Sequence, residues 1–90
     1  MEKYNMLALS TGHVSGDTAT LMDIDKCGLI IYEKEGYGWF VHIPEPFDEN
    51  KESIPKDLYK CITLARKQGC DWIMFDCDVE PIDELPVYEL

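Results

Sequence analysis

The order of apolar and polar residues predicts a small α+β domain with two layers and the succession βαββαβ. Three observations support this prediction: short runs rich in β-branched and aromatic residues, two stretches with apolar residues at helical spacing, and Gly or Pro between them. The succession is that of ferredoxin-like folds, in which two helices pack on one face of a mainly antiparallel sheet. With 90 residues the chain is expected to form one domain over residues 1–90.

The first half of the chain predicts a strand, a helix and a hairpin. An apolar run over residues 4–9 has the composition of a strand. Ser15 can cap a helix over about residues 16–26, because its side chain can accept from an amide of the first turn. Residues 29–33 and 37–43 are two further strand-like runs, and the short Gly-containing stretch between them predicts a hairpin.

The second half predicts a helix, a strand and a short tail. Proline cannot donate to a sheet ladder, so Pro44 ends the hairpin, and residues 47–53 read as a charged surface loop. Pro55 begins a second helix, whose apolar residues recur at helical spacing: Leu58, Cys61, Ile62 and Ala65. Residues 71–77 form the fourth strand, and residues 85–88 form an extended tail.

Acidic residues dominate the charge of the chain, which is −10. Seven of the eighteen Asp and Glu residues, and none of the eight Lys and Arg residues, lie in residues 71–90. Such a surface repels nucleic acid and anionic membranes and attracts a basic partner or cations. No run approaches the ~20 apolar residues that span a bilayer, and the first residues lack the features of a signal peptide, so we expect a cytoplasmic location.

The four cysteines indicate neither a disulfide framework nor a zinc site. Cys27, Cys61, Cys70 and Cys77 contain no CxxC pair, and reduced thiols are expected without a secretion signal. Cys70 and Cys77 flank the fourth strand, where we expect them to act as small buried hydrophobes. No motif indicates a cofactor.

Several short motifs, in order along the chain, resemble those of a known family. They are Ser10-Thr11-Gly12-His13-Val14 followed by Thr18-Ala19, then Tyr37-Gly38-Trp39-Phe40-Val41, Ile54-Pro55-x-Asp57-Leu58, Gly69-Cys70-Asp71-Trp72, Asp76-x-Asp78 and Leu85-Pro86-x-Tyr88. This pattern resembles a family of small uncharacterised proteins, a domain of unknown function, found in bacteria, plasmids and other mobile elements. Gly12 stands where that family usually has Ala, which loosens the turn before His13.

The turn between the first strand and the first helix is one candidate site. Ser10, Thr11, His13 and Ser15 could bind an anion at the amino end of the helix, with His13 as acid, base or donor. The alternative is that these side chains only satisfy turn amides and cap the helix. A nucleophilic triad of Ser10, His13 and Asp76 is not expected, because the first and fourth strands are antiparallel in a ferredoxin-like arrangement and their ends would lie apart.

The acidic residues after the fourth strand are a second candidate. Asp76, Asp78 and Glu80 alternate, so an extended backbone would space them about 6.5–7 Å apart on one face, too far to share an ion. The pattern also lacks the Gly of a calcium loop, and we expect no metal. Two interpretations remain for the exit of this strand: a soluble fringe, or a surface for a basic protein partner. The acidic surface comprises Asp76, Asp78, Glu80, Asp83 and Glu84.

The third and fourth strands carry apolar residues on both faces, whereas two helices cover only one face. Part of the set Trp39, Val41, Trp72 and Met74, or of the alternates Phe40, Ile73 and Phe75, is therefore expected to face a second copy of the chain. The alternative is that the tail, with Leu85, Val87, Tyr88 and Leu90, folds over that face.

These observations favour a non-enzymatic binding protein. It would engage itself, as a homodimer, or a basic protein through its acidic C-terminal region, as an inhibitor or regulator from a mobile element. The alternative is a domain for a small ligand, or an enzyme, that uses the turn over residues 10–15.

Overall fold

The predicted two-layer α+β architecture is confirmed by a computed structural model of the protein, which describes residues 1–24, 26–47 and 53–88. The described elements follow the predicted order: β1 (Met6–Ser10), a short 3-10 turn η1 (Thr11–His13), α1 (Gly16–Asp23), β2 (Ile31–Lys34), β3 (Gly38–His42), α2 (Lys56–Lys67) and β4 (Trp72–Asp76). Most of the loop predicted over residues 47–53 lies outside the described residues.

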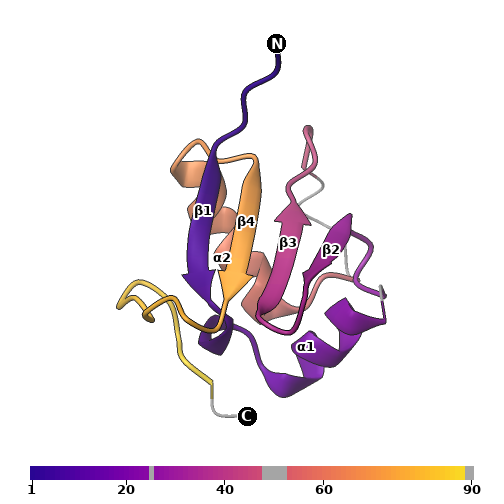
Figure 1. The fold of residues 1–90 in the computed structure, drawn as a ribbon, viewed down its shortest axis with the longest axis vertical. Helices are drawn as coiled ribbons and strands as arrows, with labels where there is room; N and C mark the ends of the chain where they lie inside the picture. The colour runs from indigo at the N-terminus through magenta and orange to yellow at the C-terminus, as the bar shows by residue number, and fades with distance from the viewer. Residues whose placement is uncertain (25, 48–52, 89–90) are drawn as a thin grey trace.

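The four strands form one mixed sheet in the order β1-β4-β3-β2 (Figure 1). The pairs β4–β3 and β3–β2 are antiparallel, as expected for a mainly antiparallel sheet, but β1 and β4 are parallel neighbours. The expected antiparallel direction of β1 and β4 is therefore wrong. The apolar run of β4 occupies a central position with a strand on each side, and Ser10 is the register partner of Asp76 at the same end of the sheet.

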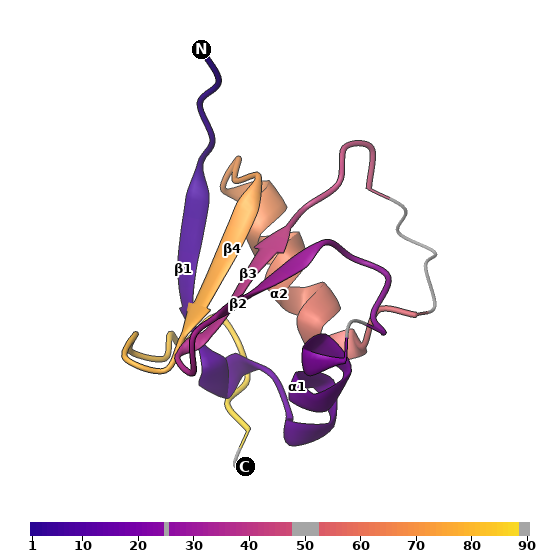
Figure 2. The ribbon, with the colours of Figure 1, turned by 45° about the vertical axis from the view of Figure 1, so that its right-hand side comes forward.

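One face of the sheet forms the core. Val41, Ile73 and Leu9 belong to alternating positions that point to this face, and each is at most 1% exposed. Figure 2 shows α2 and α1 on this side of the sheet. The buried residues of α2 are those predicted from the helical spacing, together with Asp57. α1 contributes Met22, and Asp23 at its end accepts from the Trp39 indole N–H (2.9 Å).

α1 begins where the sequence predicts and ends earlier. The Ser15 side chain accepts from the Thr18 amide, as expected of a cap, but the helix ends at Asp23 rather than near residue 26. Ile24, the residue that follows the helix, is 55% exposed.

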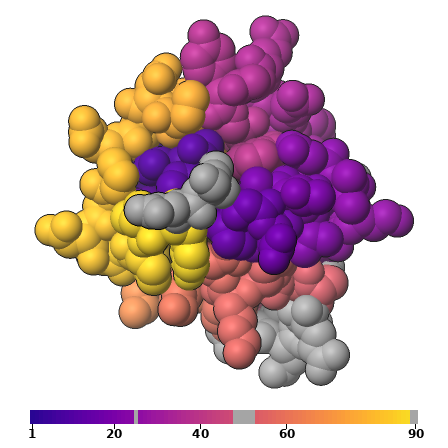
Figure 3. Space-filling model, turned by 90° about the horizontal axis from the view of Figure 1, so that it is seen from below, coloured from indigo at the N-terminus to yellow at the C-terminus, as the bar shows by residue number. Residues whose placement is uncertain are grey.

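The tail over residues 77–88 contains no strand and passes beneath the lower end of the sheet. Leu85 is buried in the core, and the Tyr88 amide donates to the Gly12 carbonyl (2.8 Å). Seen from below, the tail lies against the indigo and violet residues that follow β1 and beside α2 (Figure 3). The alternative in which the tail covers the second face of the sheet is wrong for the described residues, and Val87 is 58% exposed. Leu90 lies outside them.

Neither α-helix has the length and apolar character that crossing a membrane requires; this statement covers the described ranges only.

Candidate functional site

The turn over residues 10–15 is held by internal hydrogen bonds. The Ser10 hydroxyl accepts from the Gly12 amide (3.0 Å), and the Ser15 hydroxyl accepts from the Thr18 amide (3.2 Å). His13 is 1% exposed, its Nδ1–H donates to the Pro86 carbonyl (2.8 Å), and its Nε2 accepts from the Ile82 amide (3.0 Å). Because both ring nitrogens are engaged, His13 anchors the tail and offers no nitrogen to a ligand.

Asp57, in the first turn of α2, also holds this turn. One carboxylate oxygen accepts from the Ser15 amide (2.6 Å), and the other accepts from the Thr18 hydroxyl (2.6 Å) and the Leu58 amide (3.0 Å). Burial acts to raise the pKa of Asp57, but the hydrogen bonds from Thr18, Ser15 and Leu58 outweigh it and lower the pKa. The Ser15 amide and the Thr18 amide and hydroxyl, at the start of α1, are thus already used by Asp57 and Ser15.

Because β1 and β4 are parallel neighbours, their ends do not lie apart as expected, and this cannot exclude a Ser10–His13–Asp76 triad. The triad is nevertheless not formed. Ser10 and Asp76 are register partners. The His13 ring, however, is committed to Ile82 and Pro86.

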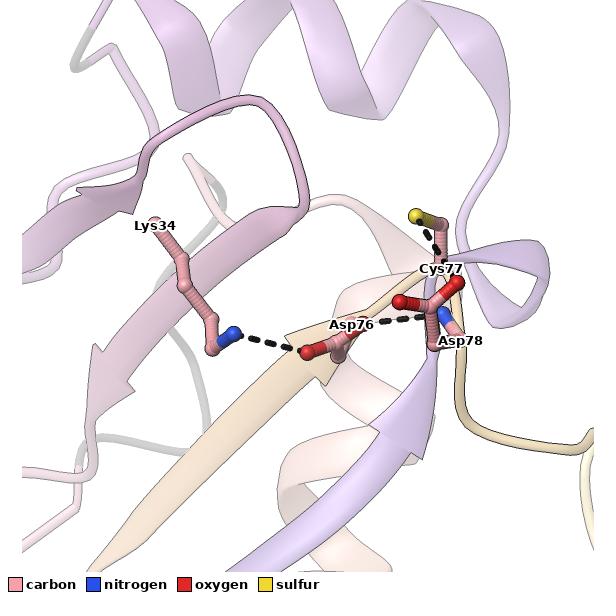
Figure 4. A network of polar contacts seen from close by, with 4 residues as sticks. All are labelled: Lys34, Asp76, Cys77 and Asp78. Carbon is pink, nitrogen blue, oxygen red and sulfur yellow. Dashed lines mark hydrogen bonds and ion pairs between the residues drawn. The ribbon is translucent and has the colours of Figure 1, made fainter.

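The chain turns after Asp76, the last residue of β4, and Asp76 forms an ion pair with Lys34. Figure 4 shows Asp76 between Asp78, whose amide donates to Oδ1 (2.8 Å), and Lys34, whose Nζ lies 2.8 Å from Oδ2. Lys34 first, and then the Asp78 amide, hold the pKa of the Asp76 carboxyl below its usual value, although burial opposes them. Gly38 lies between Asp76 and Lys34 in the register of the sheet. The expected extended row of Asp76, Asp78 and Glu80 is therefore wrong, since β4 ends at Asp76.

Asp76, Cys77 and Asp78 bring three potential metal-ligand atoms within 4.8 Å of one another, the one such group among the described residues. Both carboxylate oxygens of Asp76 are already engaged, which argues against an ion there.

The cysteines divide by burial. Cys61 is buried, as its helical spacing predicts, and Cys27 is buried too. Cys70 is half-buried, and Cys77 is exposed, contrary to the expectation of a buried hydrophobe. Burial, with the nearby Asp57 carboxylate, raises the pKa of the Cys61 thiol to about 12, so Cys61 is a packing residue rather than a nucleophile.

The other acidic residues predicted as a surface lie on the loop after β4. Asp78, Glu80, Asp83 and Glu84 are exposed. Glu84 lines a groove on α2 together with Lys60 and Lys67. Asp76 and Glu84 thus lie near lysines, and the charge of Asp78 also acts on Lys34, whereas Glu80 and Asp83 are exposed acids of the same loop.

The second face of the sheet, which we call the open face, is covered by no described element and is apolar away from the Lys34–Asp76 ion pair at one end. Its positions alternate with those of the core face and include Met6, Trp72, His42, Ala8, Met74, Phe40 and Tyr32. Tyr32 is 58% exposed and Met6 47%. The Trp72 ring contacts Tyr32 (centroids 6.2 Å apart) and His42 (5.0 Å).

The prediction that two helices leave one face of the sheet uncovered is confirmed. Of the residues predicted for that face, however, only some lie on it. Trp72 and Met74 belong to it, together with the alternate Phe40. Val41 is fully buried and Trp39 points to the core face, because each lies one residue away from Phe40 in a strand whose side chains alternate.

A shallow pocket of about 450 Å³ lies on the open face, lined by Tyr4, Met6, Tyr32, Phe40, His42 and Trp72. Two carboxylates act on Tyr4, one of its lining residues. The Tyr4 hydroxyl donates to Glu2 (2.7 Å), and Asp71 accepts from the Asn5 amide (3.1 Å). The hydrogen bond to Glu2, with some burial and the charge of Asp71, raises the pKa of Tyr4. The pocket is thus lined mainly by aromatic side chains, one of which, Tyr4, feels the charge of nearby carboxylates.

The fold and this surface define a small α+β domain with one uncovered aromatic sheet face. By sequence, the chain belongs to the family of unknown function described as the DUF5983 C-terminal domain, whose model matches residues 6–90. Neither the curated proteins nor the solved structures contain a match to the chain.

Proposed function

We propose that this domain is a non-enzymatic protein-interaction module that binds a basic partner through its open face. The observation that carries the proposal is the row of aromatic side chains around Trp72 that no described element covers. Burying one large apolar side chain contributes about 1.5–3 kcal/mol, so several exposed on one face favour association.

The charge of the domain indicates which charge its partner should carry. The domain carries −10, and the Glu2 and Asp71 carboxylates act on Tyr4 of the aromatic pocket. Nucleic acid and anionic membranes would be repelled, whereas Lys or Arg side chains can stack on aromatic faces. Proteins that handle nucleic acid carry basic surfaces of this kind, and the domain would act on such a protein as an inhibitor or regulator.

In this proposal the acidic loop has a supporting role. Asp78, Glu80 and Asp83 are exposed beside the sheet and would accelerate encounter with a basic surface. The aromatic face would set how long the complex lasts, because buried apolar anchors mainly determine dissociation.

The test starts with affinity capture, identification of the captured protein and measurement of binding between the two purified proteins. We expect a basic partner and a loss of at least about tenfold in affinity for Trp72→Ser with Tyr32→Ser. The control is Ile24→Ser, since Ile24 (55% exposed) resembles Tyr32 (58%) in exposure but lies at the end of α1. Wild-type affinity of the double variant would disprove the proposal.

A triple substitution of Asp78, Glu80 and Asp83 by Asn, Gln and Asn separates the two roles. It should slow association and flatten its salt dependence while leaving dissociation nearly unchanged. If it instead abolished binding and the face variant did not, the acidic loop would be the main contact, as the sequence predicts.

A further inference from the structure

The free edge of β1 is the second unusual feature of this sheet. β1 is an edge strand that pairs with β4 on one side only. The Asn5 carbonyl accepts from the Trp72 amide (3.2 Å), so Asn5 and the alternate residue Leu7 point their backbone groups at β4. The backbone N–H and C=O of Met6 and Ala8 consequently point away from the sheet.

Nothing among residues 1–24, 26–47 and 53–88 pairs with those outward groups of Met6 and Ala8. Edge strands are ordinarily protected by charged side chains, proline or a covering element. The other edge, β2, has such protection in Glu33 and Lys34. The sequence of β1, MLALS, contains neither a charge nor a proline.

The open face and the acidic loop both adjoin this edge. Met6, beside the edge, lines the aromatic pocket. The loop that follows β4 lies at the carboxyl end of β1 in both ribbon views (Figures 1 and 2). A strand placed along β1 would therefore have the aromatic pocket on one face and exposed carboxylates, including Asp78 and Glu80, near one end.

We infer that the edge of β1 binds an extended segment of a basic partner by strand addition. Its backbone would pair with Met6 and Ala8, and its alternate side chains would lie beside Met6 on the open face. The basic character of the segment rests on the proposed function, whereas the pairing rests on the edge itself. A second copy of the chain is the less suitable occupant, because it would bring its own charge of −10 to this edge.

The probe is a short capped peptide of alternating valine and arginine, titrated into the ¹⁵N-labelled full chain and followed by amide chemical shifts. We expect the Met6 and Ala8 amides to shift strongly. Two further peptides carry N-methyl groups on the valine amides or on the arginine amides. In an added strand only one of the two sets pairs with β1, so one peptide should lose at least about tenfold in affinity and the other should not. Equal effects of the two methylations would overturn the inference.

A variant of the protein provides a second test. Ala8→Pro removes an outward N–H without removing a bond to β4, and proline is tolerated at such edge positions. Ala8→Ser is the control, since it keeps the N–H. We expect Ala8→Pro to weaken binding of the unmethylated peptide at least about tenfold, with amide spectra checking that the fold is retained. If Ala8→Pro fails to fold, the comparison of the methylated peptides decides.

The outcomes separate this inference from the proposed function. Loss of peptide binding in Trp72→Ser with wild-type binding in Ala8→Pro would leave the open face as the binding surface and overturn strand addition. Loss in Ala8→Pro with wild-type binding in Trp72→Ser would support strand addition and contradict the proposed role of the open face.

Discussion

Asp57 joins the amino ends of α1 and α2, because its carboxylate accepts from Ser15 and Thr18 of one helix and from Leu58 of the other. We predict that Asp57→Ala lowers the free energy of unfolding by about 2–4 kcal/mol, since it leaves these buried donors without an acceptor. Urea unfolding measures this loss. Asp17→Ala is the control, because Asp17 also lies in the first turn of α1 but is exposed and should cost at most about 1 kcal/mol.

The same carboxylate predicts how stability depends on pH. Burial opposes ionisation of Asp57, but the hydrogen bonds from Thr18, Ser15 and Leu58 dominate and lower its pKa in the folded protein. Its contribution is therefore complete above the ordinary Asp pKa of about 4, and is lost as the pH falls through the lower folded-state value. Urea midpoints measured between about pH 7 and pH 3 should decline less in Asp57→Asn than in the wild type. Parallel curves would contradict this role.

For single residues, the sequence predicts helix caps but not hydrogen-bond partners that lie far away along the chain. Ser15 is recognisable as a cap from its position before a helical stretch, and that prediction is confirmed. Asp57 reads only as a helix-start residue, because the Ser15 amide that it accepts from is 42 residues away. His13 reads as a possible ligand for the same reason: its partners in the tail are 69 and 73 residues away.

At the scale of elements, the approach of β3 to β4 depends on Gly38. A Cβ at Gly38 would lie 1.8 Å from the Phe75 carbonyl oxygen, which neither strand can accommodate without moving. We predict that Gly38→Ala destabilises the fold by more than about 3 kcal/mol, measured by thermal and urea unfolding.

Gly36 in the hairpin turn is the matched control for this prediction. It has φ +85° and open space around it, so Gly36→Ala introduces backbone strain without a clash. A cost of about 1 kcal/mol is expected there. Equal costs at the two positions would show that the close contact is not the reason for Gly38.

The tail over residues 77–88 depends on the buried His13 ring. His13→Phe keeps most of the volume and removes the hydrogen bonds to Pro86 and Ile82, so we predict a loss of about 2–4 kcal/mol. Amide exchange should accelerate at Ile82 and Tyr88 before it does in β4. The control His42→Phe changes the half-buried histidine of the open face and should leave the tail unaffected. Uniform acceleration throughout the sheet would contradict a local anchor.

Element identity follows from the sequence more directly than element arrangement does. The apolar spacing of α2 and the capped start of α1 predict helices because those signals are local. The order β1-β4-β3-β2 depends on which strands meet after the chain has crossed the helix layer, and βαββαβ succession alone is compatible with more than one order. The wrong direction expected for β1 and β4 arose from this ambiguity.

For the whole molecule, two properties oppose each other in self-association. The open face around Trp72 and Tyr32 favours contact between two copies, which is the homodimer that the sequence predicts. A charge of −10 on each copy opposes that contact. The sequence shows that one sheet face must remain uncovered, but Trp39 and Val41 could be separated from Trp72 and Met74 only once the strand register was known.

The ionic strength should therefore determine the fraction of dimer. We predict that sedimentation detects mainly monomer at low ionic strength and an increasing dimer fraction as salt approaches ~1 M, where the Debye length is only about 3 Å. Trp72→Ser with Tyr32→Ser should remove the salt-induced dimer, because it removes the apolar contact that screening permits. Ile24→Ser should not, since Ile24 lies away from the open face. A dimer that forms at low salt and dissociates at high salt would instead indicate an interface held by ion pairs, and would contradict an apolar contact through the open face.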